Sequence, residues 1–294
     1  MFVTLSHTLA FAVLFLAAIF DLKTTEVPDS VSIVGVLGGI ILHFMASLSA
    51  GFDINTLLNF SLILHNPVSW IQALGDPLLW SLGVGLAFSI YGWGIYFLGM
   101  WGGADAFAMS VLGFAAPYSL TGFGLIHSVD LFLNIMIAGF LYTIVFAFYQ
   151  ASKQPEVWKD TWDQIKKQEK RVSAEIVGAG LIGFIGEYTG SFNGLFYFGF
   201  FLLLIFLYRF LKNIQDNLLS KEIPVSELEG GEVLAAEEEE GGMIVGITEE
   251  EIQELDQDTV EIREGIRFIP VFPIALLMTD VLGVGILFFQ ILVS

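Results

Sequence analysis

The sequence contains no cysteine among its 294 residues, which excludes disulfide bonds and metal sites with thiolate ligands. Its four histidines show no ligand spacing such as HxxxH, so the pattern predicts neither a metal nor a cofactor. They are His7, His43, His65 and His127. There is no glycine-rich loop of the kind that cradles phosphate, and no basic patch that would bind nucleic acid.

Positive charge is also scarce, while apolar residues are abundant. The chain has 12 Lys and Arg against 31 Asp and Glu, and 55% of its residues are hydrophobic. Its mean hydropathy of +0.74 is that of a chain with many runs long enough to cross a bilayer. We therefore expect an all-α polytopic membrane protein with about eight transmembrane helices. The expected spans are residues 2–20, 31–49, 78–100, 104–119, 129–150, 175–190, 193–211 and 269–292.

The few basic residues predict the orientation of these spans. Lys23 follows the first span, a cluster from Lys153 to Arg171 follows the fifth, and Arg209 and Lys212 close the seventh. The positive-inside tendency then places the N-terminus outside and these segments in the cytoplasm of a cell-membrane protein. The span at 175–190 is the weakest, being short and ending near Glu187. It is retained because only an even number of spans satisfies every placement.

The polar segments suggest the organisation of the chain. Residues 152–175 resemble a surface amphipathic helix, and residues 213–267 carry 17 acidic and three basic side chains. Within the acidic insert, "GMIVGIT" and "VEIREGIRFI" alternate enough to form short β-strands. The expected regions are an N-terminal membrane region of five spans at 1–150, a basic amphipathic segment at 151–174, a transmembrane hairpin at 175–211, the acidic insert at 212–267 and a last helix at 268–294.

Two carboxylates stand where apolar runs meet polar sequence. Asp21, in "FDLKTTEVPDS", closes the first run, and Asp105, in "GMWGGADAFAMSVLG", opens the fourth. Gly102 and Gly103 before it allow a sharp turn or a close approach of helices. The predicted topology puts both acids at the cytoplasmic end of their helices. Two carboxyls brought together tend to share one proton, which is the arrangement that aspartic proteases use.

These motifs, with the ending "REGIRFIPVFPIALL", resemble the archaeal type IV prepilin and preflagellin (prearchaellin) peptidases of the GxGD membrane aspartyl protease family. The resemblance covers about the first 120 and the last 30 residues. It implies that Asp21 and Asp105 are the catalytic pair, supported by Gly102, Gly103 and Ala104. It also implies cleavage of a short basic leader from pilin-like or archaellin precursors, without a cofactor.

The chain departs from the family pattern at two positions. Ala104 stands where strict GxGD has glycine, and Phe107 stands where many relatives have lysine. The first change is small, whereas the second alters how substrate or Asp105 is handled. The methyltransferase cysteines of bacterial relatives are absent, so no N-methylation activity is expected.

Plainer interpretations exist for each singled-out residue. Asp21 and Asp105 taken singly are typical of helix caps or interfacial acids, and Asp29 is expected to be the N-cap of the second span. Lys23 and Glu26 are candidate substrate contacts, although solvated side chains are the commoner interpretation of such residues.

Asp280 is a third acid, predicted near the middle of the bilayer, and we expect it to be protonated and hydrogen-bonded in packing. It leaves two other functions open. One is a presenilin- or signal-peptide-peptidase-like protease, although "PIAL" at 273–276 has an extra residue relative to the Pro-Ala-Leu motif of that family. The other is a non-enzymatic ion-coupled transporter with paired carboxylates.

Overall fold

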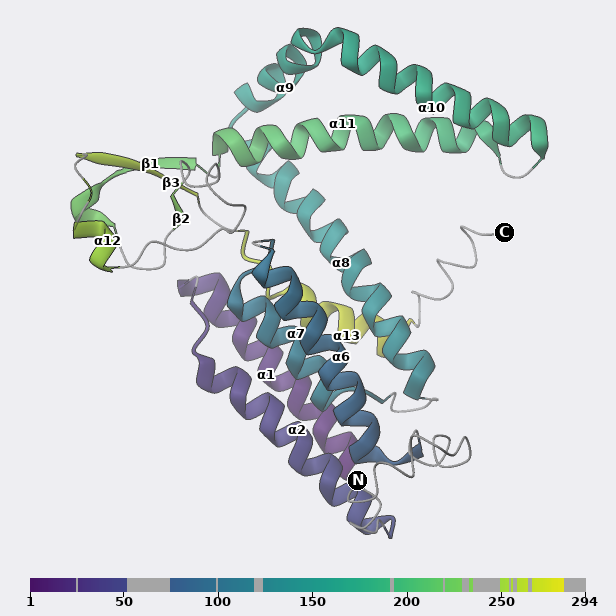
Figure 1. Cartoon of the computed structure of the whole chain (residues 1–294), viewed down its shortest axis with the longest axis vertical. Coiled ribbons are helices and arrows are strands. Elements are labelled where there is room, and N and C mark those ends of the chain that lie inside the picture. The colour runs from purple at the N-terminus through teal and green to yellow at the C-terminus, as the bar shows by residue number, and fades with distance from the viewer. Residues whose placement is uncertain are drawn as a thin grey trace. The chain divides into compact units, whose positions relative to one another are not determined.

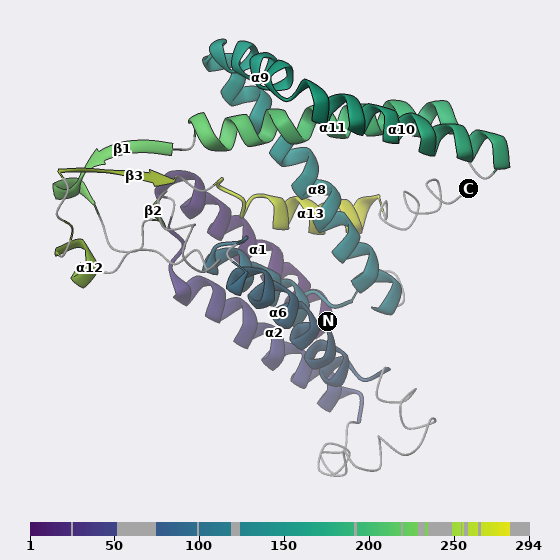
Figure 2. The same cartoon turned by 45° about the horizontal axis from the view of Figure 1, so that its top comes forward.

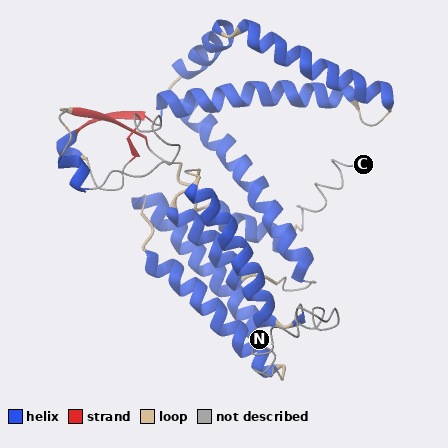
Figure 3. Ribbon diagram, in the orientation of Figure 1, coloured by secondary structure: helices blue, strands red, loops and turns tan. Residues whose placement is uncertain are grey.

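The computed structural model describes residues 1–24, 26–51, 75–98, 100–118, 124–190, 193–218, 220–228, 233–234, 249–253, 255, 258–263 and 266–282. Most of this described part is α-helical, with three short strands (Figure 3). The helices are α1 (Phe2–Thr24), α2 (Asp29–Ser49), α6 (Pro77–Phe97), α7 (Gly103–Ala115), α8 (Gly124–Lys153), α9 (Glu156–Lys167), α10 (Glu169–Thr189), α11 (Gly194–Leu218), α12 (Glu249–Gln253) and α13 (Val271–Val281). The strands are β1 (Ser220–Pro224), β2 (Val233–Leu234) and β3 (Thr259–Arg263).

The described residues form two compact units, and α8 is shared between them. The first unit holds residues 1–142 and 266–282, and the second holds residues 143–263. In the first unit, α1, α2, α6 and α7 lie side by side as a bundle, and α13 packs against α1 and α7 (Figures 1 and 2).

Glycines allow the helices of this bundle to approach closely. A Cβ at Gly113 of α7 would lie 2.8 Å from the Cα of Gly85 in α6, and one at Gly39 of α2 would lie 2.7 Å from the Cα of Ala115. Small residues at helix contacts are typical of membrane bundles, because lipid provides no hydrophobic force to join helices and van der Waals packing must do so. The fully buried Met109, Val111 and Leu112 of α7 place this helix at the centre of the core.

Polar contacts fix where α2 ends and α6 begins. Asp76 caps α6 by accepting hydrogen bonds from the backbone N–H groups of Leu78 and Leu79, both at 3.0 Å. The hydroxyl of Ser47 in α2 donates to the same carboxylate at 2.8 Å. Pro77 occupies the first helical position, where its missing N–H costs nothing. The start of α6 is thereby tied to the last turn of α2.

The second unit contains a helical hairpin of α10 and α11. Gly190 ends α10 with a left-handed φ of 65°, which glycine adopts without strain. The backbones meet at Gly183 and Gly194, where a Cβ on Gly183 would lie 2.7 Å from the Gly194 carbonyl oxygen. Deeper along the hairpin, Arg209 Nη2 pairs with Glu175 Oε2 at 2.7 Å. Helices α10 and α11 therefore pack against each other, while the expected crossing of the membrane by both of them stays a prediction.

The second unit also contains the end of α8, the helix α9 and a small sheet. Helix α9 packs against α11 through Asn213, whose amide donates to the carbonyl of Val157 at 3.0 Å and to the hydroxyl of Thr161 at 2.9 Å.

The three strands of the second unit form an antiparallel sheet in the order β1-β3-β2. Strand β3 confirms the first part of the expected strand "VEIREGIRFI", whereas "GMIVGIT" lies outside the described residues.

Five helices in the described part are long and apolar enough to cross a membrane, namely α1, α2, α6, α8 and α11. They correspond to five of the eight expected spans. Helices α7 and α13 are apolar but shorter, and α10 has the length without sufficient apolar character. The expected N-cap role of Asp29 is wrong: α2 begins at this residue, Pro28 holds the cap position, and no side-chain capping bond forms there.

Candidate functional site

Asp21 lies in the last turn of α1 and is 7% exposed. Its Oδ2 accepts a hydrogen bond from the backbone N–H of Ile269 at 3.2 Å. The guanidinium of Arg267 donates to the carbonyl oxygen of Leu22, one residue beyond Asp21, and attracts the Asp21 carboxylate electrostatically. Ile269, which lies 248 positions away in the sequence, thus holds the carboxyl group of Asp21 in place.

The segment before α13 is fixed against α8 by two contacts. The hydroxyl of Tyr142 donates to the carbonyl oxygen of Arg267 at 2.7 Å. The ring of Phe268 lies over Gly139, where a Cβ would come within 2.7 Å of it. Since Ile269 follows directly and is buried, these contacts determine where its N–H meets Asp21.

Asp105 lies in the first turn of α7 and forms half of a capping box. Its Oδ2 accepts a hydrogen bond from the backbone N–H of Gly102 at 3.1 Å, while its own N–H donates to the Gly102 carbonyl oxygen at 3.1 Å. A carboxylate is favourable here because the N-terminal end of a helix carries partial positive charge. Asp105 is thus not the N-cap that it was expected to be if taken singly: Gly102 holds that position, and Asp105 is the third residue of the helix.

The two acids share one electrostatic environment. Asp21 ends its helix and Asp105 begins its own, and the charge of Asp21 acts repulsively on Asp105. The two carboxylates that sequence reasoning selected, 84 residues apart, thus interact electrostatically, and their action as a catalytic pair stays a prediction. Two carboxyl groups of this kind can divide the roles of proton donor and proton acceptor.

The residues around Asp105 differ in part from expectation. A Cβ at Gly102 would lie 3.5 Å from Asp105 Oδ2, and one at Gly103 would lie 3.8 Å from Tyr96, both ordinary contacts. Close helix approach is made by Gly85, Gly113 and Gly39 instead. Ala104 packs against the core of the first unit, and Phe107 meets the ring of Trp93 edge-on at 5.1 Å.

The candidate substrate contacts lie beyond the buried acid. Lys23 and Glu26 are both exposed; Lys23 lies in the last turn of α1, as Asp21 does, and Glu26 follows the helix. Their side chains are therefore open to a partner molecule.

Sequence reasoning missed the roles of several residues near Asp21. Arg267 was visible only as part of the ending "REGIRFIPVFPIALL". Trp101 was not singled out, although its ring packs at 6.0 Å from Phe268 and 5.8 Å from Tyr91. Sequence spacing carried no signal for these contacts, since they join residues far apart in the chain.

A second polar cluster lies at the other end of α1. His7 Nε2 is 2.6 Å from Asp280 Oδ2, and His127 completes a group whose candidate ligand atoms all lie within 4.8 Å of one another. The structure thus gives Asp280 a histidine partner. Because the three residues come from α1, α8 and α13, the search for local spacings such as HxxxH could not find them.

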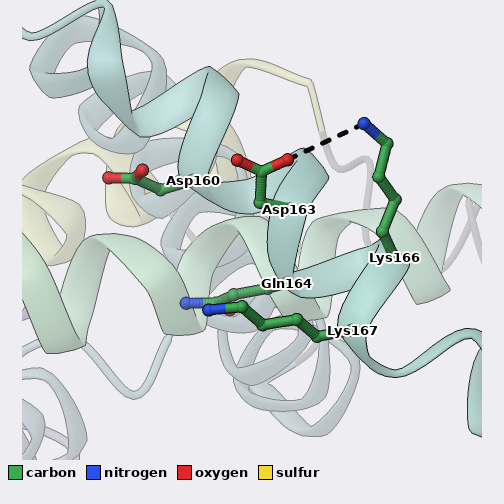
Figure 4. Close-up of a pocket in the computed structure, with 5 residues that line it drawn as sticks. All are labelled: Asp160, Asp163, Gln164, Lys166 and Lys167. Carbon is green, nitrogen blue, oxygen red and sulfur yellow. Dashed lines mark ion pairs between the residues drawn. The ribbon is translucent and has the colours of Figure 1, made fainter.

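A polar hollow beside α9 in the second unit has a different character (Figure 4). Among the described residues that line it, one ion pair forms, between Lys166 Nζ and Asp163 Oδ1 at 3.7 Å. Both side chains are exposed, and exposed ion pairs contribute little to stability. The hollow is lined by Asp160, Asp163, Gln164, Lys166 and Lys167.

No protein-family model, no curated protein and no solved structure matches this chain. Its function is therefore indicated by the two acids and the elements that hold them.

Proposed function

We propose that the protein is a membrane-embedded aspartyl endopeptidase whose catalytic pair is Asp21 and Asp105. The observation that carries this proposal is that the charge of Asp21, in the last turn of α1, acts on Asp105, in the first turn of α7. The hydrogen bond of Asp105 with Gly102 and that of Asp21 with Ile269 do not require the two acids to interact with each other. Their pairing is therefore unexplained by local structure and fits a two-carboxyl catalytic site.

The environment of the pair suggests which acid takes which role. Arg267 and the N–H of Ile269 both stabilise negative charge on Asp21, whereas the charge of Asp21 disfavours a second negative charge on Asp105, so we assign Asp21 the role of base. Asp21 removes a proton from water as the water oxygen bonds to the peptide carbonyl carbon, and Asp105 supplies its proton to the carbonyl oxygen. As the C–N bond breaks, Asp21 gives its proton to the leaving amine nitrogen and Asp105 takes one from a hydroxyl of the tetrahedral intermediate, so both acids return to their starting states and water has been added across the bond.

The place of the pair suggests the substrate. Asp21 closes an apolar helix and exposed Lys23 follows it, so the site lies where hydrocarbon gives way to water. In the proposed topology this is the cytoplasmic face, with the N-terminus outside and eight spans in the cell membrane. The substrate would be a pilin-like or archaellin precursor, cleaved between its basic leader and the apolar stretch that lies in the bilayer.

The test is cleavage of a pilin-like precursor with a Lys-rich leader by the purified full chain in lipid nanodiscs. Asp21→Asn and Asp105→Asn should each lower kcat by about 10²–10⁴-fold, because asparagine cannot exchange a proton. The matched control is Asp29→Asn, which changes an exposed acid in the first turn of α2 and should cleave at the wild-type rate.

Two results would contradict the proposal. Full turnover by either dyad variant would remove that residue from the mechanism. Mass spectrometry of the product locates the cut, and a cut in the middle of the apolar stretch would favour the presenilin-like alternative.

A further inference from the structure

We propose that His7, His127 and Asp280 form a binding site for one divalent transition-metal ion of the zinc class. The two imidazoles and the carboxylate come from α1, α8 and α13, and their candidate ligand atoms lie within 4.8 Å of one another. Two histidines and one carboxylate are a ligand set used for Zn²⁺, with a fourth position left for water.

The hydrogen bonds of the cluster select the ligand atoms. His127 Nε2 lies 3.1 Å from the carbonyl oxygen of Ala116 and donates to it, which leaves the Nδ1 lone pair free to bind a metal. His7 presents Nε2 toward Asp280 Oδ2. Two ligand atoms that each lie about 2.0–2.2 Å from a tetrahedral ion are roughly 3.3 Å from each other. His7 Nε2 and Asp280 Oδ2 are 2.6 Å apart, so they would have to move apart by less than about 1 Å to bind one ion.

Burial and charge also favour a cation at this place. His7 and His127 are 4% and 5% exposed, whereas Asp280 is exposed and leaves the site open to an entering ion. Buried Asp130, one turn after His127, interacts with it electrostatically. The carboxylates of Asp280 and Asp130 add negative charge around the two imidazoles, which a divalent ion would compensate.

The site is distinct from the proposed catalytic pair. His7 precedes Asp21 by 14 residues on α1, which at 1.5 Å per residue is about 21 Å. A metal there cannot reach the scissile bond held at Asp21. It would instead join α1, α8 and α13. Loss of the metal site would therefore leave the proposed peptidase pair unaffected, and the reverse also holds.

The experiment measures metal content and metal geometry on the full chain in nanodiscs, with any affinity tag removed. After incubation with Zn²⁺ and gel filtration, the wild-type protein should hold about one zinc per chain. His127→Ala and Asp280→Asn should hold less than about a tenth of that. The matched control is His43→Asn, which removes a fully buried histidine of the same unit that lies outside the cluster, and it should retain the zinc.

A second measurement does not depend on the folding of any variant. Cu²⁺ added to wild-type protein at one equivalent should show nitrogen couplings from two imidazoles in its electron paramagnetic resonance spectrum. The proposal is overturned if wild-type protein retains no zinc, if His127→Ala retains it fully, or if the copper spectrum shows no imidazole nitrogen. The first result would leave the cluster as a hydrogen-bonded ion pair only.

Discussion

Asp21 shows how far a single residue can be interpreted before a fold is known. Its position at the end of an apolar run indicated an interfacial acid, and "GGAD" indicated a second acid at the start of a helix. Both follow from local sequence. The contacts that orient Asp21, from Ile269 and Arg267, depend on how the end of the chain folds back, and no periodic pattern encodes that return.

Arg267 gives the residue-scale prediction. Arg267→Ala removes both the guanidinium bond to the Leu22 carbonyl and the positive charge beside Asp21. A hydrogen bond involving a charged group contributes about 1.5–3 kcal/mol, so we expect kcat for precursor cleavage to fall by about 10-fold or more while KM changes little. Steady-state kinetics on the purified variant measures this.

The control for Arg267 is Arg171→Ala. Arg171 makes an exposed pair with Glu175 on α10, which contributes little, and its loss should leave the kinetics unchanged. An Arg267 variant that lost only substrate affinity would instead assign this residue to leader binding.

At the scale of elements, long apolar runs predicted helices well and boundaries less well. Helices α1, α2 and α6 lie within a few residues of the expected spans. The polar residues 169–174 were expected in the amphipathic segment, yet they begin α10. Glu, Lys, Arg and Ala are good helix formers, so the helix extends through them regardless of hydropathy. The hydropathy of a segment indicates which residues can cross the membrane, whereas the helix propensity of the flanking residues decides where the helix begins.

Glycine contacts provide the element-scale prediction. Gly113→Ala places a methyl group 2.8 Å from the Gly85 Cα and 2.9 Å from the Val84 carbonyl oxygen, so α6 and α7 must move apart. Overpacking of this kind costs about 1–3 kcal/mol, and we expect a clearly lower Tm in detergent. Thermal unfolding followed by circular dichroism measures it.

Gly103→Ala is the matched comparison in the same helix. Its added methyl group would meet nothing closer than 3.8 Å, and alanine loses less entropy than glycine on entering a helix. We expect the Tm to be unchanged or slightly higher. Equal losses of stability in the two variants would show that close packing of α6 on α7 is not what Gly113 provides.

For the whole molecule, composition indicated the class and charge suggested the orientation, but neither settled the number of spans. Five helices of the described part meet the length and apolarity of a span, while α7, α10 and α13 do not. Helix α7 has only 13 residues, yet its core residues are fully buried by neighbouring helices. A helix enclosed by protein need not span the full hydrocarbon thickness, and hydropathy alone does not reveal such enclosure.

The number of crossings gives the whole-molecule prediction, which turns on α10. If both α10 and α11 cross the bilayer, the chain before and after the hairpin lies on one side, and the turn at Gly190 lies on the other. Reporters fused at Lys166 and at Glu239 should then both be cytoplasmic, and one at His65 should be external, because Lys and Arg are retained inside. Protease protection and cysteine labelling of single-cysteine variants in intact cells measure these sides, and the natural absence of cysteine makes each label unambiguous. Should Lys166 and Glu239 fall on opposite sides, α11 would cross alone, α10 would lie outside the hydrocarbon, and the count of eight spans would be wrong.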